Sequence, residues 1–470
     1  MLLAGVAQRQ LMPARDPKDS SPPERILIIA PHCDDEVLSS GELIHNARLR
    51  GDAIEVVVMT NGDGYRLAEI MAERRLLSTP KDFIEFGYQR AQESLDALNV
   101  LGLPAQNVIF LGLPDRGVDE IWRDYLSPTQ PYRSAYTKVT AVPYDNAYEP
   151  GAPYSALTVL NQLQKILEDF KPTEIIYPMP HDAHPDHRAT QAFVEYVLES
   201  GYRAKMGGKL KERQYLVHRG RNWPWPRGVD LTNTLYPPKD LLNIGYHWEA
   251  VEAEDESAAL KLKAIETYKS QDAALKKYLR SFARRNELFV LPLVSRVQEV
   301  AGPVEANLAK PPWMDSLAPL IQDPVGDTMS RDIEKGADFS AVYAAASEQS
   351  LFLMVKTAGK IPITTRFEAD IKVYGDAPLD EIKLTFVGRK LKDATETRVD
   401  TLHTDTKPLK DVLGSIEGNQ IGIRLPRKLV GRGVLFSMWS YANGHVWMDQ
   451  TPYRSLLLEP APGAKKPELP

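Results

Sequence analysis

The sequence has a single cysteine, no long apolar run and no strong excess of charge of either sign. Cys33 has no second cysteine to pair with, so the 470-residue chain cannot form an internal disulfide. No stretch approaches the roughly 20 apolar residues of a membrane-spanning helix, which predicts no transmembrane segment. A net charge of −6 provides no basic surface for nucleic acid. These absences exclude a disulfide-built scaffold and a nucleic-acid partner, and they leave an ordinary globular protein.

The first 24 residues differ in composition from the rest of the chain. Residues 1–8 (MLLAGVAQ) are similar to the end of an export signal, without its basic start or full apolar core. Residues 16–24 are rich in proline, serine and charge, as in a flexible tether. We therefore expect residues 1–24 to be a disordered lead-in or signal remnant, which slightly favours an exported protein, periplasmic or extracellular, over a cytoplasmic one.

Short apolar strands alternate with helical segments over residues 25–298. The four clearest strands are rich in β-branched residues and are bounded by charge, proline or glycine: 26–29, 54–59, 107–111 and 174–177. Helical patterns lie between them, and a single long helix is expected over 255–285. This alternation predicts an α/β domain with a Rossmann-like, mostly parallel sheet and flanking helices.

The pattern changes beyond residue 298. Residues 299–335 carry several prolines and are expected to form a linker. Hydrophobic residues then alternate with period two, and five short strands are expected at 351–355, 364–374, 382–387, 420–425 and 433–439. This pattern predicts a C-terminal β-sandwich over residues 336–460, followed by a disordered tail at 461–470.

Two strands of the predicted sheet end in clusters of histidine and carboxylate. Residues 31–36 (PHCDDE) follow the first strand, and residues 184–187 (HPDH) follow the strand at 174–177. His32 and Asp35 are three residues apart at a helix start, as are His184 and His187, so each pair shares one helix face. Because open α/β sheets bind ligands beyond the carboxyl ends of their strands, we expect the two pairs to lie close together.

The residue types in these clusters match a catalytic metal site. Two imidazoles and one carboxylate with an open position bind catalytic zinc, and Fe²⁺ uses a similar set. Asp34 remains beside the metal to take a proton from bound water. One of His184 and His187 is left over to donate a proton or stabilise an oxyanion. We expect Cys33 to pack as a small hydrophobic residue, and His181 is a candidate for the rim of the site.

The two motifs resemble the PIG-L/LmbE family of metal-dependent N-deacetylases, which includes N-acetylglucosaminyl-phosphatidylinositol de-N-acetylase and the deacetylases of mycothiol and bacillithiol synthesis. The resemblance extends in order over about residues 25–290. Its further matches are residues 60–64 (TNGDG), 90–93 (RAQE), 110–115 (FLGLPD), 263–265 (KAI) and 268–271 (YKSQ).

The resemblance implies specific roles at the metal. The implied zinc ligands are His32, Asp35 and His187. Asp34 is implied as the general base. His184 is implied to steady the tetrahedral oxyanion and to protonate the leaving amine.

Other matching positions imply contacts with substrate and ligands. Arg90 and Asp115 correspond to residues that hold sugar hydroxyls, and Asp186 to a residue that orients its neighbours. Cys33 departs from the family pattern, where proline is more frequent, but its presence removes no ligand.

The predicted function is the metal-dependent removal of an N-acetyl group from an N-acetylglucosamine-type sugar or glycoconjugate, with release of acetate. Two alternatives stay open. One is an amidase acting on a thiol-sugar conjugate or peptide-like amide. The other is a non-catalytic carbohydrate-binding scaffold, in which Trp439, Tyr441 and Trp447 would form a sugar-stacking platform. A Rossmann dehydrogenase is excluded because no Gly-x-Gly-x-x-Gly follows the first strand.

Overall fold

The computed structural model describes residues 11–13, 23–64, 78–220, 222–253, 255–293, 295–300, 308–311, 313–327, 335–375 and 378–458. The chain divides into two compact units. The first comprises Met1–Val197 and Gly201–Pro292, and the second comprises Leu198–Ser200 and Leu293–Pro470. None of the described helices has both the length and the apolar character needed to cross a membrane.

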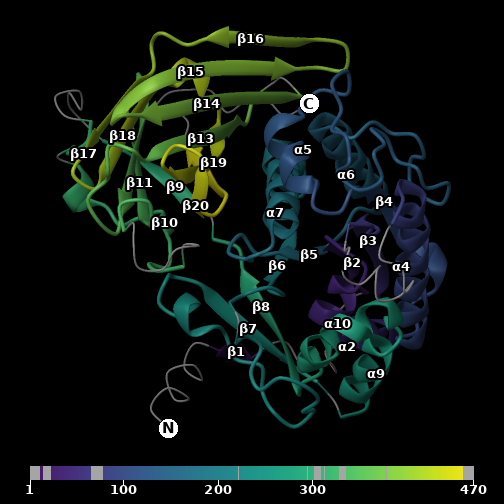
Figure 1. The fold of residues 1–470 in the computed structure, drawn as a ribbon. Coiled ribbons are helices and arrows are strands. Elements are labelled where there is room, and N and C mark those ends of the chain that lie inside the picture. The colour runs from purple at the N-terminus through teal and green to yellow at the C-terminus, as the bar shows by residue number, and fades with distance from the viewer. Residues whose placement is uncertain are drawn as a thin grey trace. The chain divides into compact units, whose positions relative to one another are not determined.

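The first unit is built on an eight-stranded sheet with the order β1-β7-β8-β6-β5-β2-β3-β4 (Figure 1). The strands are β1 (Leu11–Pro13), β2 (Arg25–Ala30), β3 (Ala53–Thr60), β4 (Val108–Leu113), β5 (Glu174–Pro178), β6 (Lys211–Tyr215), β7 (His247–Glu252) and β8 (Asn286–Leu291). The five strands from β6 to β4 in this order pair in parallel, and β8 pairs antiparallel with β6 and β7. The predicted mostly parallel α/β sheet is confirmed.

Helices pack against this sheet in two groups. The α-helices are α2 (Asp35–Arg50), α4 (Pro80–Val100), α5 (Val118–Asp124), α6 (Ala156–Phe170), α7 (Pro185–Val197), α8 (Arg203–Lys205), α9 (Asp255–Ile265) and α10 (Lys269–Leu279). Helices α2, α4 and α9 contact one another, and α7 contacts α5 and α6. Figure 1 shows α5, α6 and α7 on one side of the strands and α2, α9 and α10 on the other.

The order of the parallel strands reverses beside β2. From β2 the chain proceeds to β3 and then β4 on one side, and it later returns to place β5 on the other side. Ile28 of β2 is in register with Val56 of β3 and with Ile176 of β5. The loops that follow β2 and β5 therefore leave the sheet side by side, at the switch point where α/β sheets bind ligands.

Two features of the first unit differ from the sequence predictions. The long helix expected over 255–285 is two helices, α9 and α10, separated by residues 266–268. The Thr267 hydroxyl donates to the carbonyl of Ala264 at 2.7 Å, a local bond that competes with helix continuation. Within the expected lead-in, Leu11–Pro13 forms β1 and pairs with β7, while most of residues 1–24 lie outside the described part of the chain.

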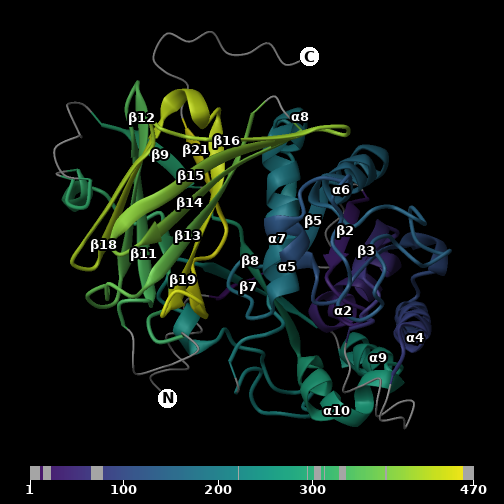
Figure 2. The ribbon, with the colours of Figure 1, turned by 45° about the horizontal axis from the view of Figure 1, so that its top comes forward.

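The second unit is a single sheet that closes on itself. Its strands are β9 (Ser295–Glu299), β10 (Ile321–Gln322), β11 (Phe339–Ala346), β12 (Ser350–Thr357), β13 (Arg366–Val373), β14 (Leu379–Val387), β15 (Lys390–Val399), β16 (Thr404–Pro408), β17 (Leu413–Glu417), β18 (Gln420–Pro426), β19 (Gly433–Ala442), β20 (Val446–Gln450) and β21 (Arg454–Leu458). The path from β11 to β21 is joined at both ends by β9, which pairs with β11 and with β21. Figure 2 shows β13, β14 and β15 of this sheet running side by side.

The predicted β-sandwich is therefore wrong, because one continuous hydrogen-bonded sheet encloses the core. Strands with alternating inward and outward side chains give the same period-two pattern in both architectures, so the sequence could not separate them. Strand β9 also belongs to this sheet, although the sequence pattern places residues up to 298 in the α/β domain. The expected tail at 461–470 lies outside the described residues.

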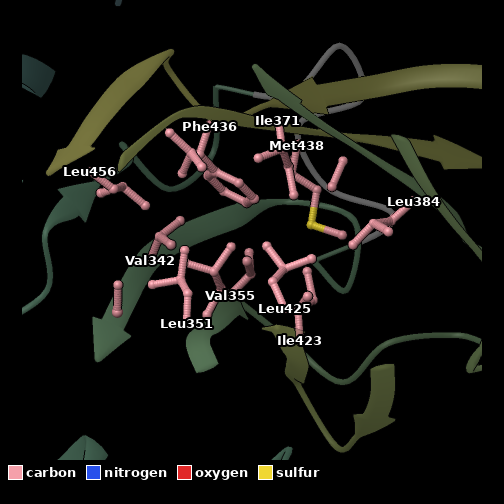
Figure 3. Close-up of a cluster of buried hydrophobic side chains, with 14 of the residues drawn as sticks. Val342, Leu351, Val355, Ile371, Leu384, Ile423, Leu425, Phe436, Met438 and Leu456 are labelled. Carbon is pink, nitrogen blue, oxygen red and sulfur yellow. The ribbon is translucent and has the colours of Figure 1, made fainter. Parts of the chain in front are cut away.

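Inward-facing side chains fill this closed sheet. Figure 3 shows Phe436 of β19 and Ile371 of β13 pointing toward Val342 of β11 and Val355 of β12. All four are fully buried. The second unit thus has its own hydrophobic core.

Replacing Phe436 by alanine should destabilise the second unit by about 3–5 kcal/mol, because a buried aromatic ring leaves a cavity that the surrounding strands cannot fill. Val387→Ala is the control, since Val387 is 48% exposed, and should change stability by less than about 0.5 kcal/mol. Equilibrium urea unfolding measures both effects. Equal losses in the two variants would contradict the core assignment.

Candidate metal and acid site

The loop after β2 is held in an unusual conformation by buried hydrogen bonds. Asp34 caps α2 with a φ of 154°, a region that non-glycine residues rarely occupy. Its backbone N–H donates to Glu36 Oε2 at 3.0 Å. Glu36 Oε1 in turn accepts from the Tyr268 hydroxyl at 2.8 Å and from the Ser94 hydroxyl. Contacts from α4 and from the start of α10 thus fix the turn that carries Asp34 and Asp35.

Asp182 anchors the loop after β5. Its Oδ1 accepts from the backbone N–H of His184 at 2.9 Å. Its Oδ2 accepts from the backbone N–H groups of Val217 and His218, each at 3.0 Å. This carboxylate therefore ties the turn before α7 to the segment that follows β6.

The predicted ligands come together between these loops. Asp35 Oδ2 lies 3.1 Å from His32 Nδ1 and 3.0 Å from His187 Nε2. His32, His184 and His187 each place a ring nitrogen within 4.8 Å of the others. Among the described residues, Asp35 Oδ1 is buried without a hydrogen-bond partner, and both ring nitrogens of His187 are buried beside carboxylate oxygens at 3.0 and 3.1 Å without hydrogen-bond geometry. Buried, close-set donor atoms without hydrogen bonds are the chemistry that a divalent cation satisfies, so the residues present fit a metal.

The charges of the cluster are strongly coupled. Burial alone would raise the pKa of Asp35, but His187 and His32 hold it well below its usual range. Burial opposes protonation of His187, whereas Asp182 and Asp35 raise its pKa to about 9. Each histidine thus lies against carboxylates that stabilise positive charge, whether it is a proton or a metal ion.

Asp34 lies beside this cluster with a different pKa. Burial and the charge of Asp35 raise the pKa of Asp34 to about 7, although Arg90 opposes the shift. The guanidinium Nη2 of Arg90 lies 3.5 Å from Asp34 Oδ2. A carboxyl group with a pKa near neutrality can both take and return a proton.

His184 is placed to donate a hydrogen bond. Burial and the neighbouring His32 and His218 hold the pKa of His184 well below its usual range, so the ring is neutral. Its Nδ1 accepts from the backbone N–H of Asp186 at 3.2 Å. The ring proton therefore resides on Nε2, which is available as a donor.

The remaining predicted residues line the turns of the same sheet edge. Asp115 Oδ1 and Asp186 Oδ2 lie 3.3 and 3.2 Å from His32 Nε2. Arg90 donates to the carbonyls of Gly62 and Cys33, both at 3.0 Å. Arg90 thus braces two loops, and its predicted contact with sugar hydroxyls, like that of Asp115, stays a prediction.

Asp186, Cys33 and His181 are all buried in the structure. Asp186 accepts from the backbone N–H groups of Arg116 at 2.6 Å and Val118 at 3.2 Å. Cys33 is fully buried, as expected for a small hydrophobic residue. His181 is also buried, and its Nδ1 lies 2.6 Å from the Tyr246 hydroxyl.

Two residues of the site were missed from the sequence. Asp182 lies 3.1 Å from His187 Nδ1, and His218 groups with Asp35 and His187, with ligand atoms within 4.8 Å of one another. The only feature of the sequence that could have indicated His218 is its position after the carboxyl end of a strand, which the structure shows to be β6, the neighbour of β5.

Asp63 adds a pH-dependent contribution to the stability of this edge. It accepts from the Tyr144 hydroxyl at 2.7 Å and the backbone N–H of Asp115 at 3.0 Å, and burial raises its pKa to about 7. The raised pKa means that the folded state binds this proton more tightly than the unfolded chain. Its stabilising contribution is complete below the unfolded pKa and is lost as pH rises through about 7.

The free energy of unfolding of the wild type should therefore fall, relative to that of Asp63→Asn, as the pH is raised from about 5 to about 8. Urea unfolding of both proteins across this range measures the difference. Parallel pH dependences would show that Asp63 does not retain its proton in the folded state.

Residues 27–198 match the PIG-L family model, described as GlcNAc-PI de-N-acetylase. Two curated relatives are 1D-myo-inositol 2-acetamido-2-deoxy-alpha-D-glucopyranoside deacetylases. That of Mycobacterium sp. (strain KMS) is 31% identical over 177 residues, covering 36% of this chain and 50% of the relative. That of Mycobacterium leprae (strain Br4923) is 26% identical over 274 residues, covering 53% and 80%. The chain thus spans about half the length of the first of these relatives.

Among solved structures, N,N'-diacetylchitobiose deacetylase from Pyrococcus horikoshii is 20% identical with a TM-score of 0.34, covering 57% of this chain and 84% of that one. The family match includes both loops that build the site, 31–36 and 184–187. Residues 27–198 of this chain form a domain of the PIG-L family.

Proposed function

We propose that this protein is a metal-dependent hydrolase that removes the N-acetyl group from an N-acetylglucosamine-type sugar or glycoconjugate and releases acetate. The observation that carries the proposal is the contact of one Asp35 oxygen with both His32 and His187, with Asp34 beside it. The names of the mycobacterial relatives support an acetamido sugar as the substrate class.

The metal would be held by His32, Asp35 and His187. Zinc suits two imidazoles and one carboxylate, and Fe²⁺ suits the same set. When bound, the ion supplies Lewis-acid polarisation of the acetamide and lowers the pKa of water to about 7.

The surrounding residues divide the proton transfers between them. Asp34 takes a proton from the attacking water, for which its pKa near neutrality is suited. The Nε2–H of neutral His184 donates to the oxyanion that develops on the acetyl oxygen. As the C–N bond breaks, the proton held by Asp34 passes to the nitrogen, so the immediate products are acetic acid and the free amine, and the acid then ionises to acetate at neutral pH. We assign the amine's proton to Asp34 rather than to His184 because the His184 ring is neutral.

The scaffold alternative has less support. Trp439 and Tyr441 are 2% and 8% exposed, and Trp447 is half-buried, so the three rings do not present an open stacking surface. A decayed enzyme has no need to keep a buried acid such as Asp34 in a rarely occupied backbone conformation, where it costs stability. The intact cluster therefore favours catalysis.

Asp34→Asn should lower kcat by about 10²–10⁴-fold, because the amide cannot accept the proton from water. Zinc content should stay unchanged, since Asp34 is not a proposed ligand. Acetate release from N-acetylglucosaminyl compounds by the zinc-loaded protein, with metal analysis of each variant, checks both outcomes. Asp169→Asn, at a side chain 65% exposed on α6, is the matched control and should retain full activity. Absence of acetate release by the wild type, or full kcat in Asp34→Asn, would contradict the proposal.

Asp182→Asn should weaken zinc affinity by about 10–100-fold, because the amide no longer places a negative charge against His187 Nδ1. The asparagine oxygen can still accept from the N–H groups of Val217 and His218, whereas its amide nitrogen cannot accept from the N–H of His184, so the Tm of the variant is measured as well to show that the turn before α7 persists. Competition with a chromophoric chelator measures the affinity, again with Asp169→Asn as control. An unchanged zinc affinity would show that His187 is not a metal ligand or that Asp182 does not support it.

A further inference from the structure

His218 lies at the edge of the site but has no role in the proposed reaction. It follows β6, the strand beside β5, and its ring centroid lies 4.6 Å from that of His187 and 5.2 Å from that of His184. A ligand atom of His218 lies within 4.8 Å of those of Asp35 and His187. His218 therefore faces the same small volume as the proposed ligands and the proposed oxyanion donor.

The His218 ring is fixed on several sides. Its backbone N–H donates to Asp182 Oδ2 at 3.0 Å, and its Nδ1 lies 3.4 Å from Asp182 Oδ1. One ring face stacks on Tyr278, with centroids 6.0 Å apart and planes inclined by 29°. Tyr278 is itself held, because its hydroxyl donates to the Val217 carbonyl at 2.6 Å and the Arg227 guanidinium lies 4.5 Å from its ring centroid. The imidazole is thus pre-oriented by the protein.

His218 is also the more accessible imidazole. Its side chain is 33% exposed, compared with 8% for His32 and 0% for His187. Asp182 Oδ1 lies 3.4 Å from Nδ1 without hydrogen-bond geometry, so its negative charge alone favours the tautomer with the proton on Nδ1, which leaves Nε2 as an acceptor. A rigid, partly exposed acceptor beside a buried reactive cluster is suited to bind the incoming molecule.

We propose that His218 is a substrate-positioning residue whose Nε2 accepts a hydrogen bond from a hydroxyl or amide N–H of the sugar next to the acetyl group. The inference rests on the proposed function and deepens it. The two histidines would make opposite kinds of hydrogen bond with the substrate. His184 donates to the acetyl oxygen, and His218 accepts from a hydroxyl or N–H of the same molecule. Asp182 links the two sides, since it contacts both His187 and His218.

The test compares His218→Ala and His218→Gln with the wild type, with zinc loaded and an N-acetylglucosaminyl compound as substrate. His218→Ala should raise KM about 10-fold, in line with the loss of one hydrogen bond, with kcat changed less than about 3-fold. His218→Gln should recover part of the loss, because its side-chain oxygen also accepts. Zinc content and Tm should match those of the wild type in both variants, and His403→Ala, at a side chain 79% exposed, is the control.

Each other outcome has a definite meaning. Loss of zinc in His218→Ala would make His218 a metal ligand and overturn the inference. A lowered Tm with unchanged KM would make it a structural residue and overturn it as well. No acetate release by the wild type would contradict the proposed function, whereas wild-type turnover with an unchanged KM in both variants would contradict only the role of His218.

Discussion

The parallel pairing of β2 with β5 is the constraint on which the site depends. Ile28 and Ile176 are in register although about 150 residues separate them, and the loops after these strands carry the two motifs. Because β3 and β4 extend the sheet on one side of β2 and β5 on the other, no strand stands between the loops. The backbone pairing of these two strands thus brings together two short turns from distant parts of the chain.

Charge compensation makes this arrangement possible within a buried region. The imidazoles of His32 and His187 lie against carboxylates, and Arg90 lies against Asp34. A second group of buried charges contacts α2. Glu287 of β8 accepts from the backbone N–H groups of Glu42 and Leu43, and the Lys261 ammonium lies 2.8 Å from the Glu287 carboxylate. Each of these buried charges is therefore met by an opposite charge or by an N–H donor, which offsets the cost of its removal from water.

The motifs sufficed to predict which residues meet, because spacing of three within a helix start and strand-end placement are local properties of the chain. The sequence did not reveal Asp182 and His218, since their role arises from the pairing of β6 with β5, which no spacing encodes. The closure of the second sheet was likewise hidden, because it depends on β9 pairing with two strands that are distant in sequence. The break before α10 falls at Tyr268, whose ψ of 68° leaves the helical region, and the helical pattern of the neighbouring residues does not reveal it.

The family match ends at residue 198, whereas the site does not. The backbone N–H groups of Val217 and His218 donate to Asp182, and the Tyr268 hydroxyl donates to Glu36. Strand β6 also pairs with one edge of β5. A recombinant fragment cut at the end of the match would expose the unpaired backbone of β5 and release the turn before α7, and bare strand edges promote self-association. The smallest piece of this chain worth expressing therefore extends at least to β8.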